Sequence, residues 1–397
     1  MLNISQIRHR LTVFCLMAAL SSNLSYASSP DAHLYLPSQH KSIVDHTVNI
    51  SAFVYRDNNV NGVYDLGDLP MSGIYVGLNH NQKRIFFSKT NNAGFANFKT
   101  SAVKKNAVIK KAGLYEFVML MPNKWRVTSG NEKQTVAIQA DDKKITGLTL
   151  VDYLKPVGLT PIKVIQGRYD FDKQGVLSLL KGNELVTELS MTPNQTFEFE
   201  VDQGEYTLTS QGTSRIVGVT NTSVYVGGLQ SGQSTSTDQK RITFDDLVDY
   251  PLFKIPNGYA GIDWQDINII RRDHGKGNNL GYINGVMSGE YLAYTTQYRP
   301  GEVFSKQPFD FHGVYLTTAW QEAEGVEVKV EIWRDEQKVA EDVFNLSALG
   351  PIHYQPNISD VTRIRFTSMN GMQVVFDDMT IARCDTLFCK IKRKFDL

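Results

Sequence analysis

The chain has 397 residues, and its 41 lysines and arginines balance its 41 aspartates and glutamates, so its formal net charge is zero. This balance provides no basic surface of the kind that binds nucleic acid or an anionic membrane, and neither partner is expected. A chain of this length predicts two or three domains.

The first 27 residues have the features of a signal peptide. Arg8 and Arg10 precede an apolar run from Leu11 to Leu20, and Ser25-Tyr26-Ala27 supplies small residues for cleavage. The apolar run is too short for a membrane-spanning helix of about 20 residues, and no later stretch approaches that length. We therefore expect an exported protein, extracellular, at the cell surface or periplasmic, with a mature net charge near −2 because two basic residues leave with the leader.

From residue 46 onward the sequence alternates apolar and polar residues in short runs separated by Gly, Asn, Asp and Pro. This pattern is typical of β-sandwiches, and long helical periodicity is missing. We predict an all-β chain of tandem sandwiches, two immunoglobulin- or prealbumin-like domains followed by a jelly roll. The predicted boundaries are a linker at 28–45, domains at 46–153, 155–229 and 241–383, a linker at 230–240 and a tail at 384–397.

The first domain contains a run with the ligand spacing of a calcium loop. Oxygen side chains stand at positions one, three, five, nine and twelve, a glycine that permits a sharp turn stands at six, and a main-chain carbonyl follows it; the residues are Asp57, Asn59, Asn61, Gly62, Val63, Asp65 and Asp68. Ca²⁺ takes six to eight oxygens, so this spacing predicts calcium as a cofactor. A polar hairpin turn without metal is the alternative.

The run from Val54 to Leu78 resembles the calcium-binding B-type repeats of bacterial surface adhesins, in which a strand, an acidic loop and a Gly-Val-x-Val-x-Leu strand follow one another. Residues 90–98 match a later element of the same repeats, with Asn91 in place of the usual acid. In the loop itself, Asn61 stands where the repeats have an acid and Asp68 stands in place of the usual Glu. The resemblance implies an ion that stiffens a stalk or scaffold and takes no part in catalysis.

The second domain contains Gly204-Glu205-Tyr206-Thr207-Leu208, a strand start that resembles small prealbumin-like sandwiches. The resemblance implies a spacer without a ligand.

The third domain begins and ends with similar strands, 242–247 and 374–381, each carrying Phe-Asp-Asp. Two such strands bracketing the domain predict a jelly roll whose first and last strands lie close together. Asp245, Asp377 and Asp378 would then meet, and a second, structural calcium site is one possibility for them. The same motifs resemble galactose-binding-like, carbohydrate-binding modules, which implies a carbohydrate or another surface ligand.

The candidate ligand-binding residues of this domain are aromatic and polar. Aromatic faces stack on sugar C–H groups, and a Gly-rich loop between strands supplies hydrogen-bonding groups. The residues are Trp264, Tyr294, Arg271, Asp273, His274 and Asn279. The alternatives are that the rings fill the core and that the loop is simply solvated.

Cys384 and Cys389 are predicted to form a small disulfide loop in an oxidising compartment, with a metal pair or a redox pair as weaker alternatives. No motif of a metalloprotease, a serine hydrolase, a phosphate-binding loop or a cysteine nucleophile is present. The predicted function is non-catalytic, adhesin-like binding of carbohydrate or another extracellular ligand. A purely structural matrix protein, or a carbohydrate-active enzyme or its accessory, remain alternatives, because distant carboxylates can meet in a fold.

Overall fold

The structure is a computed structural model, and it describes residues 40–41, 48–144, 146–230, 239–247, 252–274 and 280–383. The predicted signal peptide, Asn279 and the cysteine pair Cys384 and Cys389 lie outside these residues. The described chain is nearly all β, which confirms the predicted fold class. No helix in the described part of the chain combines the length and apolar character needed to cross a membrane.

The first domain is a sandwich of two sheets. Its six-stranded sheet consists of β1 (His40–Lys41), β2 (Val48–Arg56), β3 (Leu69–Pro70), β6 (Phe95–Thr100), β8 (Trp125–Val127) and β11 (Val157–Pro161). Its five-stranded sheet has the order β10 (Leu148–Leu150), β9 (Lys133–Ala140), β7 (Gly113–Met119), β4 (Tyr75–His80) and β5 (Lys83–Lys89). The apolar residues that alternate along these strands form one core, which includes Val54, Phe98 and Phe117.

The first sandwich continues past residue 153, the end predicted for this domain. Leu154 is buried in its core. β11 pairs in parallel with β2 and antiparallel with β8. At its N-terminal end the sandwich also extends beyond the predicted boundary, because β1 lies in the segment predicted as a linker at 28–45 and pairs with β2.

The second domain packs a four-stranded sheet against strands that belong to a much larger sheet. The four strands are β14 (Glu184–Met191), β13 (Gly175–Lys181), β16 (Gly204–Ser210) and β17 (Thr213–Val219). The opposing strands are β15 (Thr196–Glu200), β12 (Val164–Arg168) and β18 (Ser223–Gly228). In β15 the alternation predicted from the sequence holds, since Phe197 and Phe199 are buried while the residues between them are exposed.

The third domain completes this fourteen-stranded sheet. Its strands are β19 (Gln239–Ile242), β20 (Leu252–Lys254), β21 (Asp263–Gln265), β22 (Ile267–Arg271), β23 (Tyr291–Thr295), β24 (Gly301–Thr318), β25 (Glu327–Arg334), β26 (Gln337–Asn345), β27 (Ile352–Tyr354), β28 (Ile358–Ser368) and β29 (Val374–Arg383). Helical turns are short: η2 (Tyr259–Gly261), η3 (Arg272–His274), α2 (Gly281–Asn284), η4 (Gln321–Ala323) and η5 (Met369–Gly371).

The first and last strands of the third domain are neighbours, as predicted, but the predicted first strand at 242–247 is wrong beyond Ile242, because residues 243–247 form a bend and a turn in which Phe244 has φ 66°. β19 pairs antiparallel with β29, with Ile242 opposite Met379 and Arg241 opposite Thr380. β19 begins at Gln239, inside the segment 230–240 predicted as a linker.

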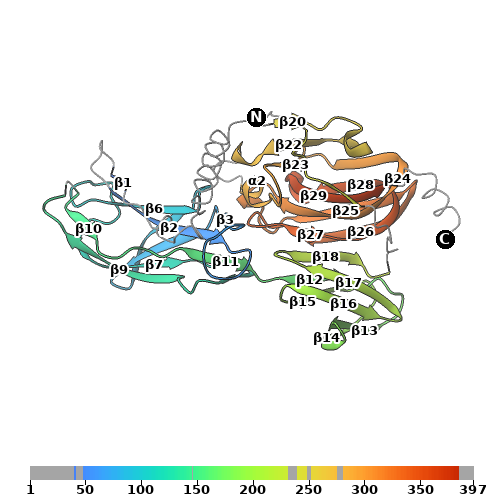
Figure 1. The fold of residues 1–397 in the computed structure, drawn as a ribbon, viewed down its shortest axis with the longest axis horizontal. Helices are drawn as coiled ribbons and strands as arrows, with labels where there is room; N and C mark the ends of the chain where they lie inside the picture. Colours follow the sequence, from blue (N-terminus) through green and yellow to red (C-terminus); the bar gives the residue numbers. More distant parts are fainter. Residues whose placement is uncertain are drawn as a thin grey trace, which may run out of the picture.

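A parallel strand pair joins the second and third domains. β18 pairs with β27, placing Ser223 opposite Ile352 and Tyr225 opposite Tyr354. Figure 1 shows the blue and teal first sandwich extending to one side, while the second and third domains lie one above the other and meet at β18 and β27. Residues of all three domains also line one cleft, so the three domains meet at this junction.

Candidate functional site

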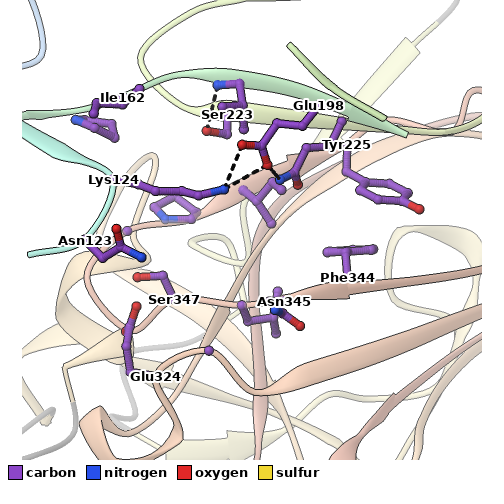
Figure 2. A pocket seen from close by; sticks show the side chains of 18 of the residues that line it. Asn123, Lys124, Ile162, Glu198, Ser223, Tyr225, Glu324, Phe344, Asn345 and Ser347 are labelled. Atoms are coloured by element: carbon purple, nitrogen blue, oxygen red, sulfur yellow. Dashed lines mark hydrogen bonds and ion pairs between the residues drawn. The ribbon is translucent and has the colours of Figure 1, made fainter. Parts of the chain in front are cut away.

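The cleft is a space of about 530 Å³ bounded by all three domains. Asn123, Lys124 and Trp125 come from the first domain, and the second and third domains supply the other walls. Its polar side chains present amide, hydroxyl, carboxylate, ammonium and guanidinium groups: Arg56, Asn123, Lys124, Gln166, Thr196, Glu198, Ser223, Glu324, Glu327, Asn345 and Ser347. Figure 2 shows several of these groups around one space, among them Lys124, Glu198 and Asn345, which come from segments far apart in sequence.

An ion pair crosses the cleft between the first and second domains. The Lys124 ammonium donates to both carboxylate oxygens of Glu198, at 3.0 and 2.8 Å, and Gln166 donates its amide to the same carboxylate. Burial raises the pKa of Glu198, but the bonds from Lys124 and Gln166 outweigh it and leave that pKa below its usual range. Glu198 is therefore held ionised, as a hydrogen-bond acceptor and not as a proton donor.

The turn that carries Lys124 has an unusual backbone. Lys124 adopts a left-handed conformation, φ 59°, which few non-glycine residues do. The Trp125 amide donates to the Pro122 carbonyl, and the Ile162 amide donates to the Lys124 carbonyl at 2.7 Å. These bonds fix the direction in which Lys124 leaves the first domain.

Aromatic rings form the floor of the cleft. Tyr225 and Phe344 stack with their ring centroids 4.4 Å apart, and Trp125 lies under the Arg56 guanidinium at 6.0 Å. All three rings are more than nine-tenths buried. They line the floor of the cleft.

The predicted calcium loop gathers its oxygen side chains around Asp65. Asn59 and Asn61 donate their amides to the two Asp65 oxygens, at 2.9 and 2.6 Å. Asp57 is fully buried and accepts the amides of Asn61 and Gly62. Gly62 has φ 76°, the left-handed conformation that the sequence predicted for the turn.

Asp68 closes the loop. Its two oxygens accept the backbone amides of Asn58 and Asp65, at 2.8 and 3.1 Å. Burial, aided by the charges of Asp57 and Asp65 and opposed by those two amides, raises the pKa of Asp68 to about 6. Three carboxylates lie close together here, and no basic side chain of the described residues makes an ion pair with them.

The side chains of the loop at 57–68 fit a hard cation such as Ca²⁺ only if uncharged oxygens serve as ligands besides the carboxylates. Nowhere in the described part of the chain do three acidic, histidine or cysteine side chains alone form a metal cluster. A calcium ion in this loop would therefore need the amide oxygens of Asn59 and Asn61 and the Val63 carbonyl besides the carboxylates. These are the oxygen ligands that Ca²⁺ accepts.

The calcium loop and the predicted ligand-binding loop of the third domain lie beside one cavity. A cavity of about 140 Å³ is lined by Asn58 and Gly67 of the loop, by Arg272, and by the turn at 287–289. Arg56, directly before Asp57, lines both this cavity and the large cleft, and it donates to the Asn221 carbonyl of the second domain at 3.1 Å. The calcium loop thus lies at the junction of the domains.

The acids predicted as a second metal site hold the turn at 287–291. Asp377 accepts the amides of Met287 and Ser288, Asp378 accepts the Ser288 hydroxyl at 2.6 Å, and Asp245 accepts the amides of Glu290 and Tyr291. Burial raises the pKa of both Asp377 and Asp378. These bonds account for the three acids as anchors of a turn.

The predicted ligand-binding loop is bonded within itself. Arg271 donates two hydrogen bonds to Asp273, at 2.8 and 2.7 Å, and His274 contacts the same carboxylate at 2.9 Å. The bond from Arg271, with that from His274, lowers the pKa of Asp273 to about 2. Asn279 lies outside the described residues. Asp273 and His274 are exposed, and the Asp273 carboxylate already accepts bonds from its neighbours.

The structure corrects the prediction that Trp264 is a sugar-stacking platform. Its ring is 2% exposed, packs edge-on against Phe244 at 5.7 Å, and donates its indole N–H to the Tyr259 carbonyl. Tyr294 is half-buried and packs edge-on against Tyr282 at 5.5 Å. A sandwich interior needs large rings, and these two serve packing.

No protein-family model matches the sequence, and no curated protein matches it. Solved structures similar to the chain include carbohydrate-binding modules. A module solved with β-1,4-galactotriose, TmCBM61, is 13% identical over 33% of this chain and 97% of its own, with a TM-score of 0.20. The tandem CBM22 modules of Paenibacillus barcinonensis Xyn10C are 10% identical over 66% of this chain and 94% of theirs, with a TM-score of 0.21.

A third similar structure contains the M60 catalytic domain and two CBM51 domains of Clostridium perfringens ZmpB. It is 11% identical over 85% of this chain but only 33% of its own, with a TM-score of 0.24. Similarity at this level assigns neither a family nor a ligand to the chain. The fold and the cleft define its class as a three-domain β-sandwich protein.

Proposed function

We propose that this chain is an exported, non-catalytic binding protein that holds a carbohydrate in the cleft where its three domains meet. The observation that carries the proposal is the polar lining of the cleft, in which amide, hydroxyl, carboxylate and ammonium groups surround one space of about 530 Å³. Sugar hydroxyls both donate and accept hydrogen bonds, so a ligand rich in hydroxyls can satisfy such a mixed lining. Pockets of this volume are typical of ligand sites.

The state of Glu198 does not fit the proton-donating carboxyl of a glycosidase. An inverting or retaining glycosidase needs one carboxyl that keeps its proton near neutral pH, which requires a raised pKa. The pKa of Glu198 is lowered, and its oxygens accept bonds from Lys124 and Gln166. A carboxylate of this kind binds hydroxyl groups.

The proposal includes a calcium ion in the loop at 57–68, as a stiffener of the junction beside the cleft. Arg56 supports this role, because it precedes the loop and lines the cleft. The ligand itself is not expected to touch the ion. An adhesin-like position at a cell surface completes the proposal.

Neutralising the ion pair of the cleft is expected to weaken carbohydrate binding at least tenfold. The variant Lys124→Met with Glu198→Gln removes both charges while keeping the side-chain lengths similar. Exposed ion pairs contribute only about 0–1 kcal/mol to stability, so the fold should persist. A glycan array probed with the full mature chain identifies the ligand, and calorimetry then compares the Kd of the variant with that of wild type. We expect a wild-type Kd in the micromolar to millimolar range, which corresponds to a binding free energy of about 4 to 8 kcal/mol.

A matched control lies in the first domain, outside the cleft. Lys133 and Glu116 form an ion pair of 2.9 Å, and Lys133→Met with Glu116→Gln should bind like wild type. If the cleft variant binds as tightly as this control, the ligand does not occupy the cleft. Release of free sugar from the bound glycan would identify the protein as an enzyme instead.

A further inference from the structure

Tyr298 carries the most exposed aromatic ring of the described residues. It lies in the loop between β23 and β24 and is 76% exposed, whereas the next most exposed aromatic residue, Tyr153, is 60% exposed. The other described tyrosines of the third domain, such as Tyr282 and Tyr354, are buried or partly buried. No aromatic ring or cation of the described residues contacts Tyr298. Its ring is therefore open to a ligand.

The backbone around Tyr298 is fixed in an unusual conformation. Tyr298 has φ 61°, a left-handed value that is unfavourable for a bulky side chain. Its amide donates to the Gly371 carbonyl at 3.0 Å, and the Arg299 amide donates to the Thr296 carbonyl at 3.2 Å. Backbone strain of this kind clusters at ligand-binding sites, where the surrounding structure maintains it. These bonds fix the direction in which the Tyr298 side chain leaves the loop.

Gly371 of η5 leaves the space that one side of the Tyr298 ring occupies. A Cβ at Gly371 would lie 2.1 Å from Tyr298 Cδ1 and 2.6 Å from Cε1. Gly371 has φ 69°, and Asn370 before it has φ 59°, so the supporting turn is left-handed as well. The ring thus packs against main chain on one side and is exposed elsewhere. This arrangement presents a flat aromatic surface on which a ligand can stack.

An ion pair in the same loop cluster offers both donors and an acceptor. Arg299 Nη1 lies 3.3 Å from Asp266 Oδ1, and the Thr296 amide donates to the Asp266 carbonyl at 2.7 Å, which joins the Asp266 turn to the Tyr298 loop. Neither side chain makes another hydrogen bond among the described residues. The guanidinium therefore keeps free N–H groups, and the carboxylate keeps free lone pairs. Because the two charges cancel, we expect an uncharged ligand.

A pyranose ring has the chemistry that these groups select. In a β-glucopyranoside the axial hydrogens on C1, C3 and C5 share one face, and the hydroxyls surround the ring. Weakly positive C–H groups are attracted to the negative face of an aromatic ring, and hydroxyls both donate and accept hydrogen bonds. We propose that Tyr298 is the stacking surface of a binding site for a neutral β-linked pyranose, whose hydroxyls bond to Arg299 and Asp266. None of these residues lines the large cleft, so this proposal does not depend on the cleft ligand.

Saturation-transfer NMR of the full mature chain with methyl β-D-glucopyranoside tests the proposal. The hydrogens on C1, C3 and C5 should receive the most saturation, because they face the Tyr298 ring. The α anomer has an axial methoxy group on that face and should bind more weakly. Tyr298→Ala should raise the Kd from the titration at least fivefold, which corresponds to about 1 kcal/mol of binding free energy. Tyr298→Phe keeps the ring and should bind nearly like wild type.

Gly371→Ala tests whether the support of the ring matters for binding. Its Cβ would displace the Tyr298 ring, so binding should weaken as it does in Tyr298→Ala. Gly182→Ala is the matched control, because Gly182 has a similar left-handed φ of 61° but has no atom within 4 Å of its Cβ position. This control should bind methyl β-D-glucopyranoside like wild type.

The cleft variant separates this site from the large cleft. Lys124→Met with Glu198→Gln should keep the C1, C3 and C5 pattern of saturation, and Tyr298→Ala should leave the affinity for the cleft ligand unchanged. Circular dichroism checks that each variant is folded, and the exposed Tyr298 variants decide if Gly371→Ala is not. The proposal is overturned by an absence of saturation transfer, by equal transfer to all ring hydrogens, or by an unchanged Kd in Tyr298→Ala.

Discussion

Replacing Trp264 with alanine is expected to destabilise the third domain by about 3 to 5 kcal/mol, the usual cost of removing a large ring from a core. The ring is 2% exposed and packs against Phe244 and Tyr259. Its loss leaves a cavity, removes the aromatic contacts and leaves the Tyr259 carbonyl without the indole donor. Urea unfolding followed by circular dichroism measures the change.

Trp264→Phe is the conservative control. It retains most of the ring volume and loses the indole hydrogen bond, so its destabilisation should be clearly smaller. Carbohydrate binding by this variant should equal that of wild type, because Trp264 does not line the cleft. A Trp264→Ala variant that unfolds like wild type but no longer binds the ligand would restore Trp264 as a binding platform.

Part of the fold could be predicted from the sequence because strand alternation and strand repetition are local signals. Phe197 and Phe199 alternate with polar residues, and the structure buries both. The shared Phe-Asp-Asp motif of residues 244–246 and 376–378 predicted neighbouring terminal strands, and Ile242 does pair with Met379, but only the second copy of the motif lies in a strand and the first lies in a turn. The alternation at Phe197 and Phe199 depends on residues whose spacing matches the two-residue period of a strand.

The pairing between domains could not be predicted in this way. Ser223 pairs with Ile352 across 128 intervening residues, and neither strand differs in composition from an ordinary strand of a single domain. The cleft could not be predicted from the sequence either, because Lys124, Glu198 and Asn345 line one space only when the domains pack together. The left-handed backbone conformation of Lys124 also could not be predicted, because lysine has no preference for turns.

For the aromatic residues, the sequence left core packing and ligand binding both open, for a different reason. A tryptophan in a β-sandwich suits the core and a binding face equally well, and its neighbours in sequence do not distinguish the two. The segment Ile262-Asp263-Trp264-Gln265 alternates, which could have indicated that Trp264 points inward with Ile262. Both side chains are buried.

Adding calcium to the full mature chain is expected to raise the melting temperature of its first domain by about 5 to 10 °C. At a calcium concentration 100 times Kd, a single site stabilises the folded state by about 2.7 kcal/mol. Each kcal/mol shifts the melting temperature by roughly 2–4 °C in a domain of 150–250 residues and by more in a smaller one. Asp57→Ala with Asp65→Ala should abolish the rise. Asp141→Ala with Asp142→Ala, in another turn of the same domain, should leave it intact.

The same site predicts how calcium binding depends on pH. The Asp68 carboxyl, buried in the loop, has its pKa raised from 3.8 to about 6. Without calcium, the unfolded chain loses this proton first as pH rises from about 4, so the stability contributed by protonated Asp68 is present below about pH 4 and is lost by about pH 6. Calcium competes with the proton, so its affinity should rise with pH up to about 6 and then level off.

Apparent Kd values measured by calorimetry at pH 5 and pH 7 should therefore differ about tenfold, since the proton occupies Asp68 roughly nine-tenths of the time one unit below its pKa. Asp68→Asn removes the titrating group, and its weaker calcium binding should be nearly independent of pH over this interval. An affinity that is equal at the two pH values in the wild type would place the ion away from Asp68. A melting temperature that millimolar calcium leaves unchanged would show that residues 57–68 form a polar turn without a metal.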